Sequence, residues 1–274
     1  MQPKLPLSVF IICKNEADRI HLPITSTREL VDEIIVIDSG SSDGTMDIAW
    51  KLGADRVVFN EWKGYGPQKV HGETLCRNDW LLNLDADEAI SPALAEELRA
   101  MFEHGLPAPA LYAIDNVMVF PHETTPRRFA PHGYFVRLYD RRMAGFKDST
   151  VHDSVVAKGS PLPIVKLKYP ILHSGFRSYR HMIEKMNFYT DMQAKDLHTR
   201  GKRIPSWRLF TEAPVMFFKA YFGRGYWRFG SEGAVHSLFY AFARTIRLAK
   251  LRELEKISQS KHTQNTGEYS ESHP

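Results

Sequence analysis

The stretch WLLNLDADE, residues 80–88, decides the fold, because it reads as a buried strand that ends in acidic residues. Asp85 and Asp87 lie one residue apart, so their charges repel unless solvent, a helix N-terminus or a cation compensates them. A hard divalent cation that carries phosphate oxygens is the most specific such partner. The alternative is a solvated turn before a helix, since Ser91-Pro92 has the pattern of an N-cap followed by proline. The stretch by itself leaves both interpretations open.

Two apolar runs upstream of this stretch also end in polar residues. The run from Leu7 to Cys13 stops at Lys14-Asn15-Glu16. The run from Glu33 to Ile37 ends in Asp38, and a loop of small residues then leads into a helix. Such a strand, loop and helix N-terminus form an arrangement that binds phosphate or ribose. The alternation of strands and helices predicts an α/β fold with a mainly parallel sheet and ligands at its carboxyl edge. The polar residues expected at that edge are Asn15, Glu16, Asp38, Lys69, Asp85 and Asp87.

The chain beyond Phe102 has a different pattern. Pro107 and Pro109 mark a boundary, and the next apolar segments are separated by loops rather than by regular helices. These segments, at 111–120, 134–139 and 164–168, predict a mixed or antiparallel sheet. A helix is expected from Ser178 to about Arg200, because apolar residues recur there at helical spacing.

The last part of the chain combines aromatic and basic residues. Leu209 to Phe222 and Ala234 to about Lys256 have the pattern of amphipathic helices with a basic side, which is typical of helices in a membrane interface. Packing against the rest of the chain, or a dimer contact, is the alternative. The polar residues 258–274 have little to bury and are expected to be disordered.

Composition narrows the possible classes of protein. The 274 residues include two cysteines, which offers no disulfide framework, and no segment has the length of a signal peptide or a membrane span. We therefore expect a cytoplasmic protein. The net charge is +4, but basic residues are concentrated in the C-terminal half. An anionic partner is expected there: a membrane surface, a phosphorylated glycan or nucleic acid.

Three motifs taken together indicate a family. FIICKNE at 10–16, VIDSGSSDGT at 36–45 and WLLNLDADE at 80–88 resemble, in order and spacing, the family 2 glycosyltransferases. These are inverting enzymes of the GT-A fold that use nucleotide-sugar donors. Further segments at 127–142, 151–155 and 171–189 are similar to the branch that includes the lipopolysaccharide core β-1,4-glucosyltransferases.

The resemblance extends to about Gly201 and implies a domain organisation. Residues 1–201 would form the GT-A domain, with a nucleotide-sugar-binding half at 1–104 and an acceptor half that supplies the catalytic base at 105–201. An amphipathic basic helical region at 202–257 and the tail at 258–274 would follow.

The resemblance also implies a donor site. A nucleoside diphosphate leaves readily only if its developing charge is neutralised, and Mg²⁺ or Mn²⁺ does this as a Lewis acid. Asp87 would hold the cation, Asp85 would face the ribose and the cation, and His173 would be a third contact to the metal or diphosphate. Lys69 would approach the base or the phosphates. The uracil and ribose pocket would be lined by Asn15, Glu16 and Asp38, with Ser39 standing where many relatives have a second aspartate.

Inversion at the anomeric carbon needs one general base, which takes the proton of the acceptor hydroxyl. The matching motif in this branch usually reads His-Glu, and here it reads His152-Asp153, so the resemblance implies Asp153 as the base. An ion pair of Asp153 with Arg137 or Arg141 is the structural alternative. The other candidates for the base are His152, Glu123 and Asp148.

The expected activity is transfer of a hexose, with UDP-glucose as donor, onto a lipopolysaccharide-core or other lipid-linked acceptor. The enzyme would be peripheral at the inner face of the cytoplasmic membrane, bound to anionic lipid through its C-terminal helices. Polyprenyl phosphate, or a capsule or exopolysaccharide intermediate, is an alternative acceptor. A nucleotide-sugar-binding protein without turnover is the alternative of another class. We expect no nucleic-acid partner, because only the basic charge favours one.

Overall fold

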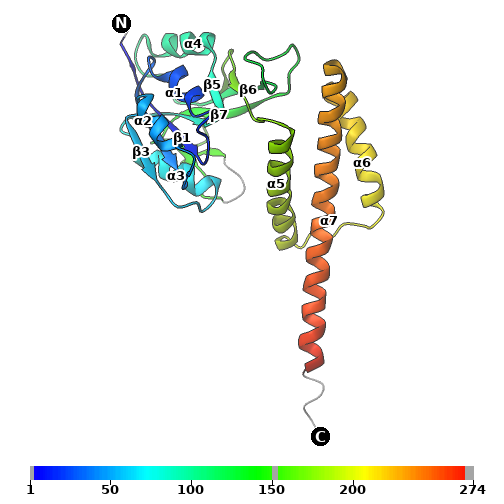
Figure 1. Cartoon of the computed structure of the whole chain (residues 1–274). Helices are drawn as coiled ribbons and strands as arrows, with labels where there is room; N and C mark the ends of the chain where they lie inside the picture. The colour runs from blue at the N-terminus through cyan, green and yellow to red at the C-terminus, as the bar shows by residue number, and fades with distance from the viewer. Residues whose placement is uncertain (1–2, 150–153, 269–274) are drawn as a thin grey trace. The chain divides into compact units, whose positions relative to one another are not determined.

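The computed structural model describes residues 3–149 and 154–268, and it divides the chain into two compact units, with the boundary between Gly175 and Phe176. The first unit contains the sheet and the second is helical (Figure 1). The assignment of a transferase domain to residues 1–201 and of a membrane-binding region to 202–257 stays a prediction.

Among the described residues, nine strands form one sheet, in the order β3-β2-β1-β4-β7-β6-β11-β5 with β10 beside β6. The first four strands of this order run parallel. β7 is antiparallel to both of its neighbours, which confirms the mixed character expected of the second half of the sheet. The strands are β1 (Leu5–Cys13), β2 (Val31–Asp38), β3 (Arg56–Phe59), β4 (Trp80–Asp85), β5 (Glu88–Ile90), β6 (Leu111–Met118), β7 (His132–Asp140), β10 (Ile164–Lys166) and β11 (Ile171–His173).

Successive residues of β1 enter two separate cores, because side chains alternate between the faces of a strand. Val9 and Ile11 pack on the face that α1, α2 and α4 cover. Phe10 and Ile12 pack on the other face, with α3 and the hairpin of β8 and β9. This double coverage explains the nearly continuous apolar run of β1. The elements that cover the sheet are α1 (His21–Thr27), α2 (Thr45–Lys51), α3 (Tyr65–Leu75), α4 (Pro92–Phe102), β8 (Ala144–Phe146) and β9 (Val155–Ala157).

The start of α4 confirms the cap predicted from the sequence. Ser91 has extended backbone and its hydroxyl accepts a hydrogen bond from the amide of Leu94 at 3.2 Å. Pro92 occupies the first helical turn, where its missing amide hydrogen costs nothing. The acidic end of β4 is therefore a strand terminus that is followed first by β5 and then by the capped helix α4.

The helical unit is built around α7. α7 lies between α5 and α6 (Figure 1) and packs on both of them. Lys250 of α7 forms an ion pair with Asp191 of α5 at 2.8 Å and donates to the hydroxyl of Thr190 at 2.9 Å. No described helix is both long enough and apolar enough to cross a bilayer. The elements are α5 (Tyr179–Thr199), α6 (Arg208–Phe218), the π-helical turn η1 (Lys219–Gly223), the 3₁₀ turn η2 (Tyr226–Phe229) and α7 (Gly230–Glu268).

The end of α7 differs from the sequence-based expectation. The helix continues to Glu268, whereas the apolar spacing predicted an end near Lys256 and disorder from residue 258. The added segment contains no proline, the residue that would interrupt a helix most strongly. Apolar periodicity therefore indicated the packed part of this helix rather than its full length.

Candidate active site

The loops that follow β1 and β2 are held together by side-chain to backbone hydrogen bonds. Asp38, at the end of β2, is fully buried, and its Oδ1 accepts from the amides of Gly40 and Ser41 at 2.8 Å each. Its Oδ2 accepts from the hydroxyl of Ser41. The carboxylate of Asp38 thus shapes the small-residue loop that begins α2.

Asn15 connects the two loops directly. Its amide donates to the hydroxyl of Ser41 at 2.7 Å, and its side-chain oxygen accepts from the amide of Ser42 at 2.9 Å. The backbone of Asn15 has a φ of 55°, in the left-handed region that asparagine tolerates better than most residues. The amide of Glu16 donates to the hydroxyl of Thr45 at 2.8 Å. The edge predicted to receive uracil and ribose is therefore one connected assembly.

Asp85, at the carboxyl end of β4, is flanked by two cations. The Nζ of Lys69 lies 3.0 Å from its Oδ1, and Nη2 of Arg137 lies 3.0 Å from its Oδ2. Lys69 is 1% exposed, and the carboxylate of Asp85 compensates its buried charge. Burial raises the pKa of Asp85, but Lys69 and Arg137 outweigh it and hold the pKa well below its usual range. Asp85 is ionised at neutral pH, with a cation at each oxygen.

A buried polar network lies directly behind Asp85. Glu88 accepts from the amide of Asp85 at 2.8 Å, from Nη2 of Arg137 at 2.5 Å and from the side chain of Asn116. Arg137 also donates to the side-chain oxygen of Asn83 at 2.9 Å. Burial raises the pKa of Glu88, which Arg137 counteracts and the charge of Asp85 reinforces. Glu88 thus holds the end of β4 through the backbone amide of Asp85, and it is the first residue of β5.

Asp87 lies between a histidine and an arginine. Its Oδ2 is 3.5 Å from Nε2 of His173, at the end of β11, and 3.4 Å from Nη1 of Arg19. Arg19 is buried, binds both carboxylate oxygens of Glu16 at 2.8 Å and donates to the carbonyl of Ser174 at 2.8 Å. This arginine thereby joins the loop after β1 to the acidic end of β4 and to the end of β11.

Gly175 makes room for the imidazole of His173. A Cβ at residue 175 would lie 2.9 Å from Cε1 and 3.0 Å from Nε2 of His173, which is closer than such contacts normally are. The absence of a side chain there lets the ring approach Asp87. A carboxylate oxygen and an imidazole nitrogen are donors that suit Mn²⁺, and the carboxylate also suits Mg²⁺.

The donor set therefore fits a divalent cation through Asp87 and His173, with the remaining positions open to phosphate oxygens. Asp85 is a less available ligand, because its two oxygens already contact Lys69 and Arg137. Within the described residues, no group of three or more histidine, cysteine, aspartate or glutamate side chains is arranged to hold a metal by itself. A cation here would depend on the diphosphate for part of its coordination.

The hairpin of β8 and β9 leads to the predicted base. Phe146, the last residue of β8, lies under Nζ of Lys69, which is 5.1 Å from its ring centroid. Lys147 donates to the carbonyl of Ser154 at 3.0 Å and closes the described part of the hairpin. Asp153 and His152 lie outside the described residues. The end of β8 lies beside the lysine that binds Asp85.

Comparison with known proteins identifies the family. A sequence model described as glycosyl transferase family 2 matches residues 8–160, which is more than half of the chain. The chain is a family 2 glycosyltransferase. Its mixed, mainly parallel sheet and its flanking helices form the GT-A fold, as the motifs predicted.

Two relatives resemble this transferase over most of its length, and one solved structure resembles a part of it. An uncharacterized glycosyltransferase of Rickettsia felis is 44% identical over 90% of this chain and 89% of that protein. The lipopolysaccharide core biosynthesis glycosyltransferase LpsC of Rhizobium meliloti is 30% identical over 92% of this chain and 93% of that protein. Glucosyl-3-phosphoglycerate synthase of Mycobacterium tuberculosis, solved with Mn²⁺ and UDP-glucose, is 26% identical, with 42% of this chain and 44% of that chain covered and a TM-score of 0.33.

Sequence reasoning missed the residues that support the site of the transferase. Arg19 follows the first motif by three residues and gave no signal of its own, because its partners come from β4 and β11. Arg137 and Asn83 did leave a signal, since each is a polar residue within an otherwise apolar strand. A buried polar side chain needs a hydrogen-bonding partner, so these two could have been matched to each other.

Proposed function

We propose that this transferase moves a hexose, with inversion, from a UDP-sugar to a lipopolysaccharide-core or other lipid-linked glycan. The observation that carries the proposal is the assembly of Asp85, Asp87 and His173 with the two hydrogen-bonded loops at one edge of the sheet. UDP-glucose is the proposed donor. The similarity to LpsC over nearly the whole chain supports a core-oligosaccharide acceptor.

The positions of the side chains support the proposed roles. Asp87 and His173 would hold the divalent cation, and Lys69 would lie beside the phosphates or base. Asp85 would face the ribose, which its two cation contacts support. The cation, when bound, would neutralise the charge of the departing diphosphate. The uracil and ribose would be received by the connected loops, which contain Asn15, Glu16 and Asp38.

The reaction needs one proton transfer and one bond exchange. Asp153 would accept the proton of the acceptor hydroxyl as that oxygen attacks the anomeric carbon. The bond between this carbon and the diphosphate oxygen breaks, and the electron pair leaves with UDP. Attack from the face opposite the diphosphate accounts for inversion.

The base assignment is tested by Asp153→Asn, with Asp148→Asn as the matched control on the same hairpin. We expect Asp153→Asn to keep UDP affinity in calorimetry and to lose transfer, with Asp148→Asn close to the unmodified enzyme. Undiminished transfer by Asp153→Asn would remove the assignment. Transfer by none of the proteins, including the unmodified chain, would favour a nucleotide-sugar-binding protein without turnover.

The division of labour between the two aspartates is tested by nucleotide binding. Asp87→Asn should abolish the gain in UDP affinity that Mn²⁺ or Mg²⁺ provides, because a metal ligand is lost. Asp85→Asn should keep that gain and lower UDP affinity with and without cation. A titration of UDP-sugars against GDP-sugars in the same calorimeter defines the base preference. If the unmodified protein binds nucleotide with the same affinity with and without divalent cations, the proposed metal site is contradicted.

The acceptor and the place of the reaction are separate questions. Purified enzyme with core oligosaccharide, polyprenyl phosphate or a capsule intermediate distinguishes the proposed acceptor from its alternatives. We also propose that the C-terminal helices bind anionic lipid at the inner face of the cytoplasmic membrane. Exposed aromatic side chains beside basic ones support this, and cosedimentation of the full chain with anionic vesicles tests it.

A further inference from the structure

A cluster of charged residues lies between α6 and α7. Glu212 of α6 is 3% exposed, and its Oε2 accepts from Nη2 of Arg208 at 2.7 Å. Its Oε1 is 3.7 Å from Nε of Arg244, which is too long for a hydrogen bond. Arg247 is partly buried on the same helix as Arg244. Three guanidinium groups therefore accompany one carboxylate.

The hydrogen bonding of this cluster is incomplete within the described residues. Nε of Arg244, Nε of Arg247 and Oε1 of Glu212 are buried and have no hydrogen-bond partner. Burial and the neighbouring Arg244 and Arg208 lower the pKa of Arg247, while Glu212 opposes this. Unsatisfied donors and excess positive charge in a partly buried place are costly unless an anion binds there. Guanidinium groups match a phosphate group in charge and geometry.

The surface of α6 and of the turn η1 that follows it indicates the source of such an anion. Phe210, Phe218 and Phe222 are 83%, 57% and 61% exposed. Residues 202–229 contain six lysines or arginines and one acid, which is the buried Glu212. The solvent-facing side chains of this segment thus include aromatic and cationic groups and no acid. Aromatic side chains enter the boundary of a bilayer and cations bind its phosphates, so this composition complements an anionic lipid surface.

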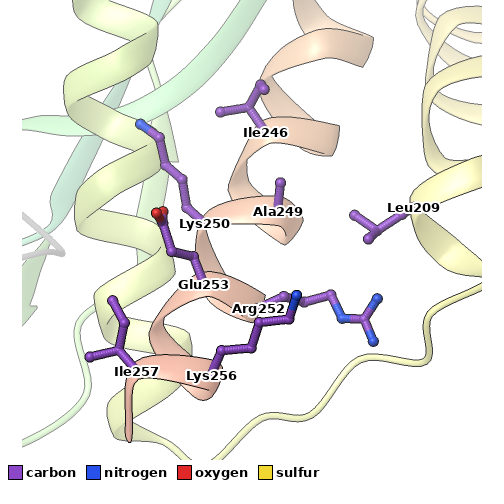
Figure 2. A pocket seen from close by; sticks show the side chains of 8 residues that line it. All are labelled: Leu209, Ile246, Ala249, Lys250, Arg252, Glu253, Lys256 and Ile257. Atoms are coloured by element: carbon purple, nitrogen blue, oxygen red, sulfur yellow. The ribbon is translucent and has the colours of Figure 1, made fainter. Parts of the chain in front are cut away.

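A cavity between α6 and α7 is lined mostly by apolar and basic side chains. It measures about 580 Å³, and Leu209 of α6 faces Ala249 of α7 across it (Figure 2). Leu209 and Ile246 are chain neighbours of Arg208 and Arg247, so the apolar wall begins next to the cluster. A soluble phosphate would not need an apolar wall, whereas the first methylenes of a phospholipid would use one.

We propose that Arg208, Arg244 and Arg247 bind the phosphate of an anionic phospholipid headgroup when α6 lies on the bilayer. The inference rests on the proposed membrane location and adds a specific headgroup site to it. Glu212 holds Arg208 in place, and the side chains of Arg208 and Arg244, which are 36% and 34% exposed, can be reached by the phosphate oxygens. The aromatic side chains of α6 enter the lipid beside this site.

The test compares two pairs of substitutions with equal loss of charge. Arg244→Gln/Arg247→Gln changes the cluster, and Lys195→Gln/Arg200→Gln changes the last turns and the C-cap of α5, on the other side of α7 (Figure 1). The full chain is sedimented with phosphatidylglycerol-containing vesicles and with pure phosphatidylcholine vesicles. We expect the cluster pair to weaken binding to the anionic vesicles about thirtyfold, and the α5 pair about threefold or less. Equal losses for the two pairs would overturn the proposed site, because general electrostatic attraction between the basic protein and the anionic vesicles would then explain the binding.

Two further measurements make the test decisive. Arg244→Lys/Arg247→Lys keeps the positive charge. It serves as the test variant if the protein with two glutamines does not fold. We expect it to bind about tenfold more weakly than the unmodified chain, because lysine lacks the planar fork. Soluble glycerol phosphate should not displace the protein from vesicles, and full displacement would assign the site to a free phosphate. UDP affinity should be unchanged in all variants, so a failure of the lipid site is distinguishable from a failure of the proposed transferase function.

Discussion

Replacement of Arg137 by methionine is the sharpest test of the network behind the acidic end of β4. Arg137 is 7% exposed and donates to Asn83, Asp85 and Glu88. Methionine keeps much of the apolar volume but removes the cation that the buried Glu88 shares with the partly exposed Asp85, while Lys69 still contacts Asp85. Removal of one partner from a buried pair costs about 3–5 kcal/mol, since the remaining charge is uncompensated. We expect that loss in the free energy of unfolding at neutral pH.

The pH dependence of the loss identifies its cause. The pKa of Glu88 is raised in the folded protein, so protonation of Glu88 adds stability as the pH falls towards its unfolded value of about 4.3. Without Arg137 the pKa of Glu88 rises further, because the cation that lowers it is gone. The deficit of Arg137→Met should therefore shrink between neutral pH and about pH 5. The pKa of Asp85 is depressed, so its contribution is lost only at more acid pH.

Urea unfolding at several pH values measures both effects. Arg142→Met is the matched control: Arg142 also pairs with carboxylates, but its side chain is 58% exposed, so we expect a much smaller loss than for Arg137→Met. Arg137→Met/Glu88→Gln should cost about 1–3 kcal/mol less than the sum of its single substitutions, because the facing charges are no longer both present. A pH-independent deficit, or one below about 1 kcal/mol, would refute the reasoning.

Two further predictions concern the environment of the β8–β9 hairpin. Tyr139→Phe removes the 2.6 Å hydrogen bond to Glu73 and should cost about 1.5–3 kcal/mol at neutral pH in urea unfolding. Burial raises the pKa of Glu73, so this cost should fall as the pH drops through the raised pKa, and a constant cost would contradict the prediction. Gly66→Ala places a Cβ 2.4 Å from two carbonyl oxygens of residues 147–149 and should lower kcat about tenfold or more, since the hairpin that leads to the predicted base must move. Gly72→Ala, which meets the Phe10 ring in the core instead, should cost about 1–3 kcal/mol of stability with little change in kcat; an equal loss of kcat in both variants would show that the loop is not responsible.

Local patterns in the sequence were enough to predict the parallel strands in the first part of the chain. Each strand there is a contiguous apolar run, and polar residues follow it directly, as with Asp38 after β2 and Asp85 at the end of β4. Parallel strands bring their carboxyl ends to one edge, so residues that are distant in sequence could be placed together without a structure. The cap of α4 at Ser91 was predictable for the same reason, because its partner is three residues away.

The supporting contacts of the site were decided only by the tertiary structure. Arg19 meets Asp87 and Ser174, and Arg137 meets Asp85 and Glu88, across separations that no local periodicity records. The availability of each aspartate as a ligand depends on these cations, and the motif alone could not assign it. The amino-acid sequence by itself determined the family, the order of the strands' polar ends and the residue types at the site. The packing of β4, β7 and β11 decided which charges compensate one another, because Coulomb interactions depend on distances that only the folded chain establishes.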